Sequence, residues 1–231
     1  MSAPYDLTNA LIGLPEVKQA LTIPQGDTAD DYAISMAIDA ASKEIEDATE
    51  RRFYQDAAPS TRTFVAENMW EVQVDDFMTL AGLKIVADYA GAGDFTNGIQ
   101  FALPTVVDGK TLEGGDVQLE PLNGLIRGQP WAFDHIRAIR SLYFPIWSTI
   151  NWAQPYAQAL VQVTAMWGWD HVPVGVRQAA LLESISIYSM RNAPFGATAF
   201  GETGIVRAKP EMHPAAMKLI RPYMRESVLV G

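Results

Sequence analysis

The sequence contains no cysteine, which excludes disulfide bonds and thiolate metal sites. It has no apolar run near the roughly 20 residues that a membrane helix needs. Its first eight residues are polar and carry Asp6, unlike the basic and apolar start of a signal peptide. We therefore expect a protein made in the cytoplasm that enters no membrane. Its 231 residues, 48% of them hydrophobic, can bury a core in one large domain or two small ones.

Basic residues are scarce: 17 Lys and Arg stand against 27 Asp and Glu, for a net charge of −10. Phosphate contact needs a basic surface, so this balance argues against a sequence-reading nucleic-acid binder. The charge is also uneven, with ten acidic residues and two lysines in 1–50, but ten basic and six acidic residues in 127–231. Either the split is chance on solvated helix faces, or oppositely charged ends meet across subunit contacts and set their register.

Patterns typical of catalysis and metal binding are also missing. His135, His171 and His213 lie far apart, and none has a second ligand at metal spacing. The sequence has no Gly-x-Ser-x-Gly elbow and no phosphate-cradling glycine motif. It therefore predicts no catalytic residue, no metal and no cofactor. An enzyme whose site is built from scattered residues stays a less favoured alternative.

Residues 1–58 are predicted to be helical. Pro15 suits the first turn of a short helix to Leu21, and Asp27 suits the N-cap of a longer helix over 28–52. An apolar stripe over four turns marks the buried face of the longer helix. It consists of Ile34, Ile38, Ala41, Ile45 and Ala48.

The opposite face of this longer helix is predicted to be solvated. Its members are Asp31, Ser35, Asp39, Ser42, Glu46 and Glu50. The dense carboxylates Glu44, Glu46, Asp47 and Glu50 would lie in water, where their pKa values need not shift. Farther along the chain, the pair Asp75–Asp76 is too little to indicate a calcium site.

From Pro59 the hydrophobic period changes to that of strands, with Gly, Asp and Asn at the breaks. The predicted strands are Thr61–Val65, Trp70–Val74, Leu83–Ala87, Gly98–Leu103, Asp116–Glu120, His135–Leu142 and Ala159–Met166. Their connections are too short for crossover helices, so we expect a mostly antiparallel β module.

A second long helix is predicted over 173–191. Its polar positions Arg177, Ser184 and Arg191 form a narrow stripe with Glu183 beside it, and apolar residues cover the rest. A helix that is apolar on most sides must be buried on most sides. The first long helix can supply part of that cover, and a neighbouring subunit is a plausible source of the remainder. Ile187 and Met190 are therefore candidates for a protein interface.

The fold class that follows is α+β: a helical bundle of N- and C-terminal helices with an inserted, mostly antiparallel β module. We expect domain boundaries at 1–58, 59–166 and 167–231. The last segment holds the helix, a Gly-rich loop over 196–204, a basic tail and a short helix over 212–221. Ordering of that tail by a neighbour would use Phe195, Phe200, Arg207 and Lys209 as further interface candidates.

Aromatic residues gather in one region, since five of the six tryptophans lie within 131–169. Those of the last predicted strand and its turn are expected in the core. The segment 143–156 instead contains two prolines and no charge, so it reads as an uncharged loop or hairpin. Three interpretations of this segment stay open: it packs on its own sheet, it forms a protein interface, or it stacks on sugars. The interface reading uses Tyr143, Trp147, Trp152 and Tyr156.

One stretch also resembles a known family. Residues 161–169, Val-Gln-Val-Thr-Ala-Met-Trp-Gly-Trp, are followed by Val172–Pro173 and by a helix that starts Val-Arg-Gln-Ala-Ala-Leu-Leu at 176–182. This order is similar to that of head–tail connector proteins of long-tailed phages, also called head-completion or adaptor proteins. The helix end at 191–196, the Gly-rich loop to Gly204 and the acidic turn at 27–31 match the same group. The segment 143–156 departs from its compact pattern.

The resemblance implies a structural subunit of the virion neck, at the portal vertex of the capsid. About twelve copies would form a ring below the portal protein. The ring would extend the DNA channel and offer a platform for the next connector or a tail-completion protein. DNA would pass through without sequence-specific binding, and no cofactor would be needed. A carbohydrate-binding or protein-binding β module is the alternative from another class.

Overall fold

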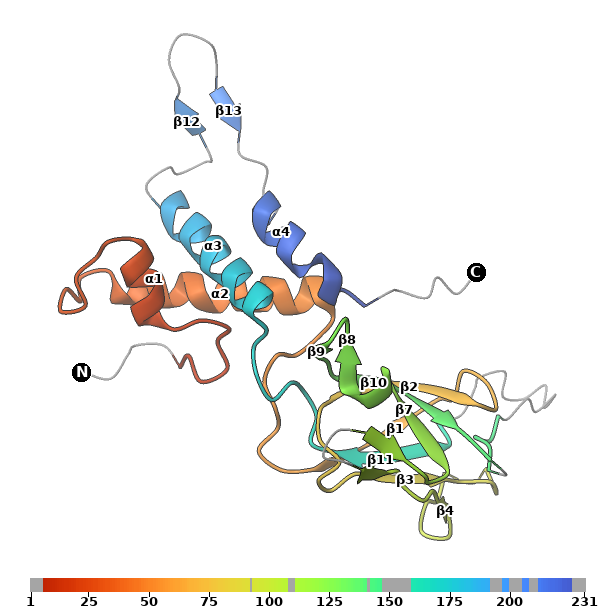
Figure 1. Ribbon diagram of the computed structural model, residues 1–231. Coiled ribbons are helices and arrows are strands. Elements are labelled where there is room, and N and C mark those ends of the chain that lie inside the picture. The colour runs from red at the N-terminus through yellow and green to blue at the C-terminus, as the bar shows by residue number, and fades with distance from the viewer. Residues whose placement is uncertain are drawn as a thin grey trace. The chain divides into compact units, whose positions relative to one another are not determined.

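The computed structural model describes residues 6–91, 93–107, 111–140, 142–146, 159–191, 197–199, 205–207 and 212–225 (Figure 1). Over these residues the chain forms four α-helices and several antiparallel sheets, which confirms the mixed α+β class. The chain divides into two compact units. One, the helical unit, combines Met1–Phe53 with His171–Gly231, and the other, the β unit, is Tyr54–Asp170.

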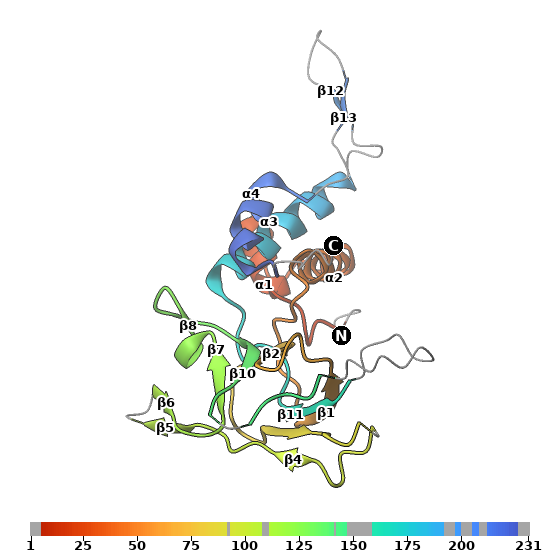
Figure 2. The same ribbon diagram turned by 90° about the vertical axis from the view of Figure 1, so that its right-hand side faces the viewer.

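The helical unit contains α1 (Leu14–Ala20), α2 (Asp31–Thr49), α3 (Val174–Met190) and α4 (Pro214–Ile220), with the short 3-10 turn η3 (Arg221–Tyr223) after α4. A small antiparallel hairpin, β12 (Ala197–Ala199) with β13 (Ile205–Arg207), lies between α3 and α4 in the chain. Helix α3 packs against both α2 and α4 (Figures 1 and 2). The termini of the helices are close to those expected from the sequence.

The apolar stripe of α2 forms much of the core of this unit. Ile34, Ile38, Ala41 and Ile45 are completely buried, as their spacing predicts. The solvated face, in contrast, was predicted too wide. Ser35 and Ser42 are buried, and the Ser42 hydroxyl donates to the carbonyl of Ile38 while accepting from the N–H of Leu11. Ser42 is buried because its hydroxyl can bond within its own helix, whereas the buried hydroxyl of Ser35 has no hydrogen-bond partner among the described residues.

The start of α2 also differs from the expectation. Its N-cap is Asp30, and the predicted cap, Asp27, instead accepts a hydrogen bond from the N–H of Ala29 in the preceding turn. Buried Lys18 explains this turn, because its ammonium binds the carboxylate of Asp31 at 2.8 Å and also the carbonyls of Gln25 and Asp27. The loop between α1 and α2 therefore winds around one cation.

The C-terminal segment is fastened to the end of α2. Glu50 ends the helix in the left-handed conformation, at φ +53°. The guanidinium of Arg51 then donates to the carbonyl of Tyr223 at 2.8 Å, and the ring of Phe53 meets that of Tyr223 edge to face. The N–H of Arg225 donates to the carbonyl of Thr49. Segments from the two ends of the chain thus complete one unit.

Two sheets form the β unit (Figure 2). The first, in the order β1-β11-β3-β4, consists of Ser60–Phe64, Val161–Ala165, Lys84–Ala87 and Ile99–Gln100. The second, in the order β2-β10-β7, consists of Glu71–Phe77, Phe133–Ala138 and Val117–Glu120. All of these pairs are antiparallel. The inward side chains share one core, centred on Val72, Phe77, Ile85, Val163 and Trp167.

Every segment predicted as a strand contains one, although the strand near Gly98 is only two residues long. Besides the β12–β13 hairpin, two short hairpins of the β unit were not predicted. They are β5 (Thr105–Val107) with β6 (Thr111–Glu113), and β8 (Leu125–Ile126) with β9 (Gln129–Pro130), which follows the 3-10 turn η1 (Leu122–Gly124). Among the described residues, no helix is long and apolar enough to cross a membrane.

Candidate assembly surfaces

The outward face of α3 is the first candidate surface. α3 turns Ala179, Ala180, Glu183 and Ser184 inward, and all four are buried. The predicted polar stripe is therefore wrong at Ser184 and at its neighbour Glu183. Small side chains let α3 approach α2 and α4 closely, so the large apolar ones are displaced outward.

This outward face is mainly apolar, and the exposed charge on it, Arg177, is paired with Glu16 of α1. Its members recur at helical spacing: Val174 is 83% exposed, Gln178 is exposed, and Leu181 and Ile185 are partly exposed. A surface of this kind usually marks a contact site. Of the two interface candidates predicted in α3, Met190 is 43% exposed and Ile187 is partly buried, and their spacing from Glu183 puts both on the inward side of the helix and not on this face.

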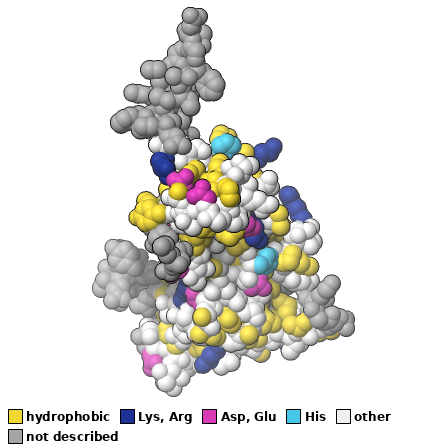
Figure 3. Space-filling model, turned by 90° about the vertical axis from the view of Figure 1, so that its left-hand side faces the viewer, with side chains coloured by type: hydrophobic (Ala, Val, Ile, Leu, Met, Phe, Trp, Pro, Cys, Tyr) yellow, Lys and Arg dark blue, Asp and Glu magenta, His cyan; other side chains and the backbone are white. Residues whose placement is uncertain are grey.

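The outward face of α2 is a second candidate. Tyr32, Met36 and Ala40 follow one another at intervals of four residues and are all exposed, Tyr32 by 54% and Met36 by 45%. Farther along the same face lie the exposed Asp47 and Glu50. The exposed base Lys43 lies between the two groups and pairs with Asp39 at 2.9 Å, so the face has an apolar half and a second half with more acids than bases. Figure 3 shows one side of the protein, on which hydrophobic side chains reach the surface in both units.

The β unit has an exposed aromatic edge of its own, made by Met69, Trp70, Tyr143 and Ile146. Trp70 is 52% exposed, and Tyr143 is 42% exposed. The N–H of Phe144 donates to the carbonyl of Met69, and the ring of Tyr143 meets that of Tyr89 edge to face at 5.4 Å. Tyr143 is one of the interface candidates predicted from the sequence. Trp70 is not, because its position at the start of a predicted strand gave no sign of exposure.

The remaining candidates in 143–156 and the tail cannot be placed. Trp147, Trp152, Tyr156, Phe195, Phe200 and Lys209 lie outside the described residues. Arg207 belongs to β13, of which the backbone is described. Their role at an interface remains a prediction.

The other tryptophans are core residues, as expected for the last predicted strand and its turn. Trp167 and Trp169 are completely buried, and Trp131 is nearly so. The indole N–H of Trp167 donates to the carbonyl of Ser60, and that of Trp169 donates to the carboxylate of Asp76 at 2.7 Å. Asp76 therefore serves the core as an acceptor, while Asp75 pairs with Arg62.

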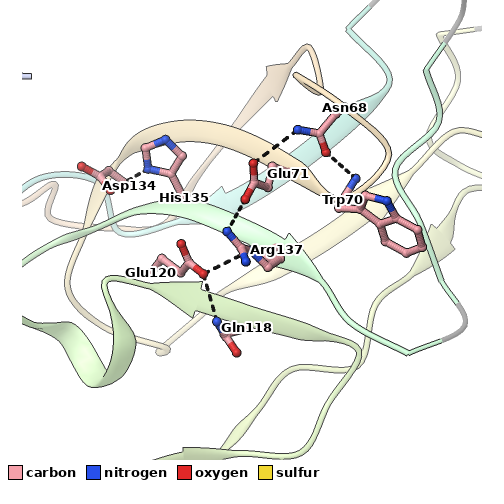
Figure 4. A network of polar contacts seen from close by, with 8 residues as sticks. All are labelled: Asn68, Trp70, Glu71, Gln118, Glu120, Asp134, His135 and Arg137. Carbon is pink, nitrogen blue, oxygen red and sulfur yellow. Dashed lines mark hydrogen bonds and ion pairs between the residues drawn. The ribbon is translucent and has the colours of Figure 1, made fainter. Parts of the chain in front are cut away.

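A polar network covers the outer face of the β2-β10-β7 sheet (Figure 4). Arg137 on β10 binds Glu71 on β2 and, through Nε at 3.2 Å, Glu120 on β7, which also accepts from Gln118. One guanidinium thus joins three strands. Because the guanidinium is shared between both carboxylates, this network suits strand pairing better than acid–base chemistry.

His135 lies on the same sheet, next to this network. Its Nδ1 is 2.9 Å from the carboxylate of Asp134. That hydrogen bond raises the pKa of His135, against an opposing effect of burial, and the charges of Asp134, Glu67 and Glu120 raise it further. Among the described residues, no group of three or more His, Asp or Glu could hold a metal ion.

Glu46 corrects the expectation that the acids of α2 are all ordinary surface groups. It is half-buried, and its atom Oε1 is buried without a hydrogen-bond partner among the described residues. Burial raises its pKa to about 7, although the N–H of Phe53 and the charge of Arg52 oppose the shift. Burial also raises the pKa of Glu44, helped by the charge of Glu183.

The described part of the β unit also has a surface hollow of about 530 Å³ beside the β8–β9 hairpin. Its lining includes Met78, Pro130, Trp131 and Phe133, with Asp170 as its charged member. Enzyme sites converge several polar groups on an apolar pocket. This hollow does not, so it adds little to the enzyme alternative.

The chain matches no family model, and no curated protein matches it either. Its fold is similar to that of a chain from the neck of an empty GTA particle, computed with C6 symmetry. The TM-score is 0.51 at 17% identity, over 100% of this chain and 96% of that chain. A chain from the virion of a native gene transfer agent (GTA) particle has a TM-score of 0.46 at 17% identity, over 100% and 97% of the two chains, which is too low to argue from.

Proposed function

We propose that this protein is a structural neck subunit, a head–tail connector that forms a ring below the portal of a phage-like particle. The ring, of about twelve copies, extends the DNA channel and gives the next connector or the tail its platform. The subunit catalyses no reaction. Its partners are further copies of itself, the portal protein and a tail-side protein.

The observation that carries this proposal is a shared fold along two nearly complete chains. Both the helical unit and the inserted β unit have counterparts in a protein of a particle neck, because the likeness spans 100% of one chain and 96% of the other. The order of motifs around 161–182, noted from the sequence alone, supports the same function.

The surfaces support an assembly role as well. Exposed apolar side chains lie on α2, on α3 and on the edge around Trp70, which is more than a lone monomer needs. The net charge of −10 suits a channel wall that does not retain the DNA passing through it.

Deletion of the gene from a particle-producing strain tests the proposal. We expect DNA-filled heads and free tails that remain unjoined, and joining restored by the wild-type chain. Gold-labelled antibody against the chain should mark the head–tail junction in electron micrographs. Labelling of the capsid lattice or of tail fibres, or normal joining without the gene, would contradict the proposal.

A further inference from the structure

The outward faces of α2 and α3 differ in a way that bears on how copies meet. The face of α3 carries Val174, Leu181 and Ile185 over about 16 Å, at 1.5 Å per residue. The face of α2 carries Tyr32, Met36 and Ala40 over about 12 Å by the same rise. These are two apolar stripes of similar length on one helical unit, and each is exposed in the single chain.

The rims of the two stripes have opposite charge. Next to α3 lies α4, which presents the exposed base Lys218, and the turn η3 after it presents the exposed Arg221, while Glu183, the acidic residue of α3, is buried. The stripe of α2 continues into the exposed acids Asp47 and Glu50, and the exposed base among them, Lys43, is paired with Asp39 of the same helix. A basic rim beside one stripe and an acidic rim beside the other make the two faces complementary.

The same charges disfavour symmetric pairing. If α3 met α3 across a two-fold axis, the bases of both α4 helices would face each other, and α2 against α2 would oppose carboxylates. A contact between unlike faces is heterologous, and a heterologous contact repeats from copy to copy until it closes into a ring. These charges therefore favour head-to-tail contact over a two-fold dimer.

We infer that the α3 face of one copy, with its α4 rim, packs on the α2 face of the next copy. This inference rests on the proposed function, since it assigns the subunit contact of the neck ring. The apolar stripes exclude water at the centre of the contact. The pairing of Lys218 and Arg221 with Asp47 and Glu50 sets its direction.

The absence of native cysteine makes a clean test possible, because each introduced thiol is unique. Ala40→Cys and Gln178→Cys replace exposed side chains, one on each face, by side chains close to or below their size. Particles are assembled with each single variant, with a mixture of the two, and with the double variant. They are treated with a short bis-maleimide, which tolerates some distance between thiols, and run on a denaturing gel.

The three arms give different results for different contacts. We expect most of the double variant to shift into a ladder of multimers, the mixture to stop at dimers, and each single variant to stay monomeric. Met36→Cys with Ser189→Cys provides a second pair on the same two faces. A double variant with Ala40→Cys and Thr96→Cys, which moves the second thiol to an exposed site in the β unit, should give no ladder.

Failure of the inference can be told from failure of the function. Dimers formed by a single variant indicate two-fold pairing, and particles that contain the chain but link in neither double variant exclude this contact. Either result overturns the inference and leaves the neck role standing. An immunoblot that finds no wild-type chain in purified particles overturns the proposed function without any cross-linking.

Discussion

The carboxylate of Glu183, in the middle of α3, accepts a hydrogen bond of 2.7 Å from the backbone N–H of His213, which caps α4. His213 in turn accepts from the N–H of Ala215 through Nδ1. A negative charge at the start of a helix is favoured by the helix dipole. This buried acid therefore fixes where α4 begins and holds it on α3.

Replacement of Glu183 tests that role. Glu183→Ala leaves a half-buried N–H without its acceptor, so we expect a loss of roughly 1–3 kcal/mol in the free energy of unfolding. Hydrogen exchange in α4 should rise more than in α2. Glu183→Gln keeps an acceptor and should lose less, and Gln178→Ala, exposed on the same helix, should change stability by less than about 0.5 kcal/mol. Equal protection of α4 in all variants would contradict the role.

Glu46 predicts a pH dependence of stability. Its pKa of about 7 in the folded chain lies above the ordinary value of 4.5 for a glutamate. Between these two pH values the folded state therefore holds a proton that the unfolded chain has released. The resulting contribution to the free energy of unfolding is complete below pH 4.5 and is lost as the pH rises through about 7. Glu46→Gln should be more stable than wild type above pH 7 by about 1–3 kcal/mol, since each pKa unit corresponds to about 1.4 kcal/mol. Denaturant unfolding at pH 4 and pH 8 measures this, and a gain of equal size at both values would reject it.

Two glycines with positive φ form a matched pair. At Gly168, with φ +95°, an added Cβ would lie 1.8 Å from the carbonyl oxygen of Tyr54, whereas at Gly93, with φ +74°, it would meet nothing within 4 Å. Gly93→Ala should therefore cost about 1–2 kcal/mol from backbone strain alone. Gly168→Ala adds a clash that must displace the chain, so its loss should clearly exceed that of Gly93→Ala. Similar melting temperatures for the two variants would be inconsistent with the close approach of Gly168 to the backbone of Tyr54.

Trp70 and Trp167 separate an assembly role from a core role. Trp70→Ala removes a side chain that is already 52% exposed, so the melting temperature of the monomer should change little while head–tail joining falls. Trp167→Ala removes a completely buried ring and should cost roughly 3–5 kcal/mol. Thermal unfolding of the isolated chain and counts of joined particles give the two readouts. Normal joining with Trp70→Ala would exclude that edge as a contact.

For the interface candidates Trp147 and Trp152 we expect the same result as for Trp70, an unchanged melting temperature with impaired head–tail joining. Trp147→Ala or Trp152→Ala should leave the melting temperature of the isolated chain nearly unchanged and block joining, with losses of roughly 2–4 kcal/mol in binding. A destabilised monomer that still assembles in the cold would instead place these side chains in the core. Phe101→Ala, at a completely buried position, provides the reference for core loss.

The sequence predicted those parts of the fold that a repeating pattern determines. The stripe of α2 has a single apolar side, so Ile34 and Ile45 could be assigned to the core. Helix α3 has apolar residues all around, so the pattern does not indicate which face points inward. That face is set by the small residues Ala179 and Ala180 and by the hydrogen bond of Glu183 at the start of α4. Such a contact joins residues far apart in the chain. The same holds for Glu46, whose burial depends on how the chain turns back at Phe53.

The β unit begins and ends at neighbouring points, because Ser60 pairs with Ala165 across β1 and β11 and the N–H of Asp56 donates to the carbonyl of Trp167 at 2.8 Å. The helical unit therefore has only a short gap to bridge, whatever the size of the insertion within it. An insertion with paired ends can be lengthened, shortened or exchanged during evolution without breaking the fold that carries it. The helices can in this way stay the same while the surface of the inserted unit changes.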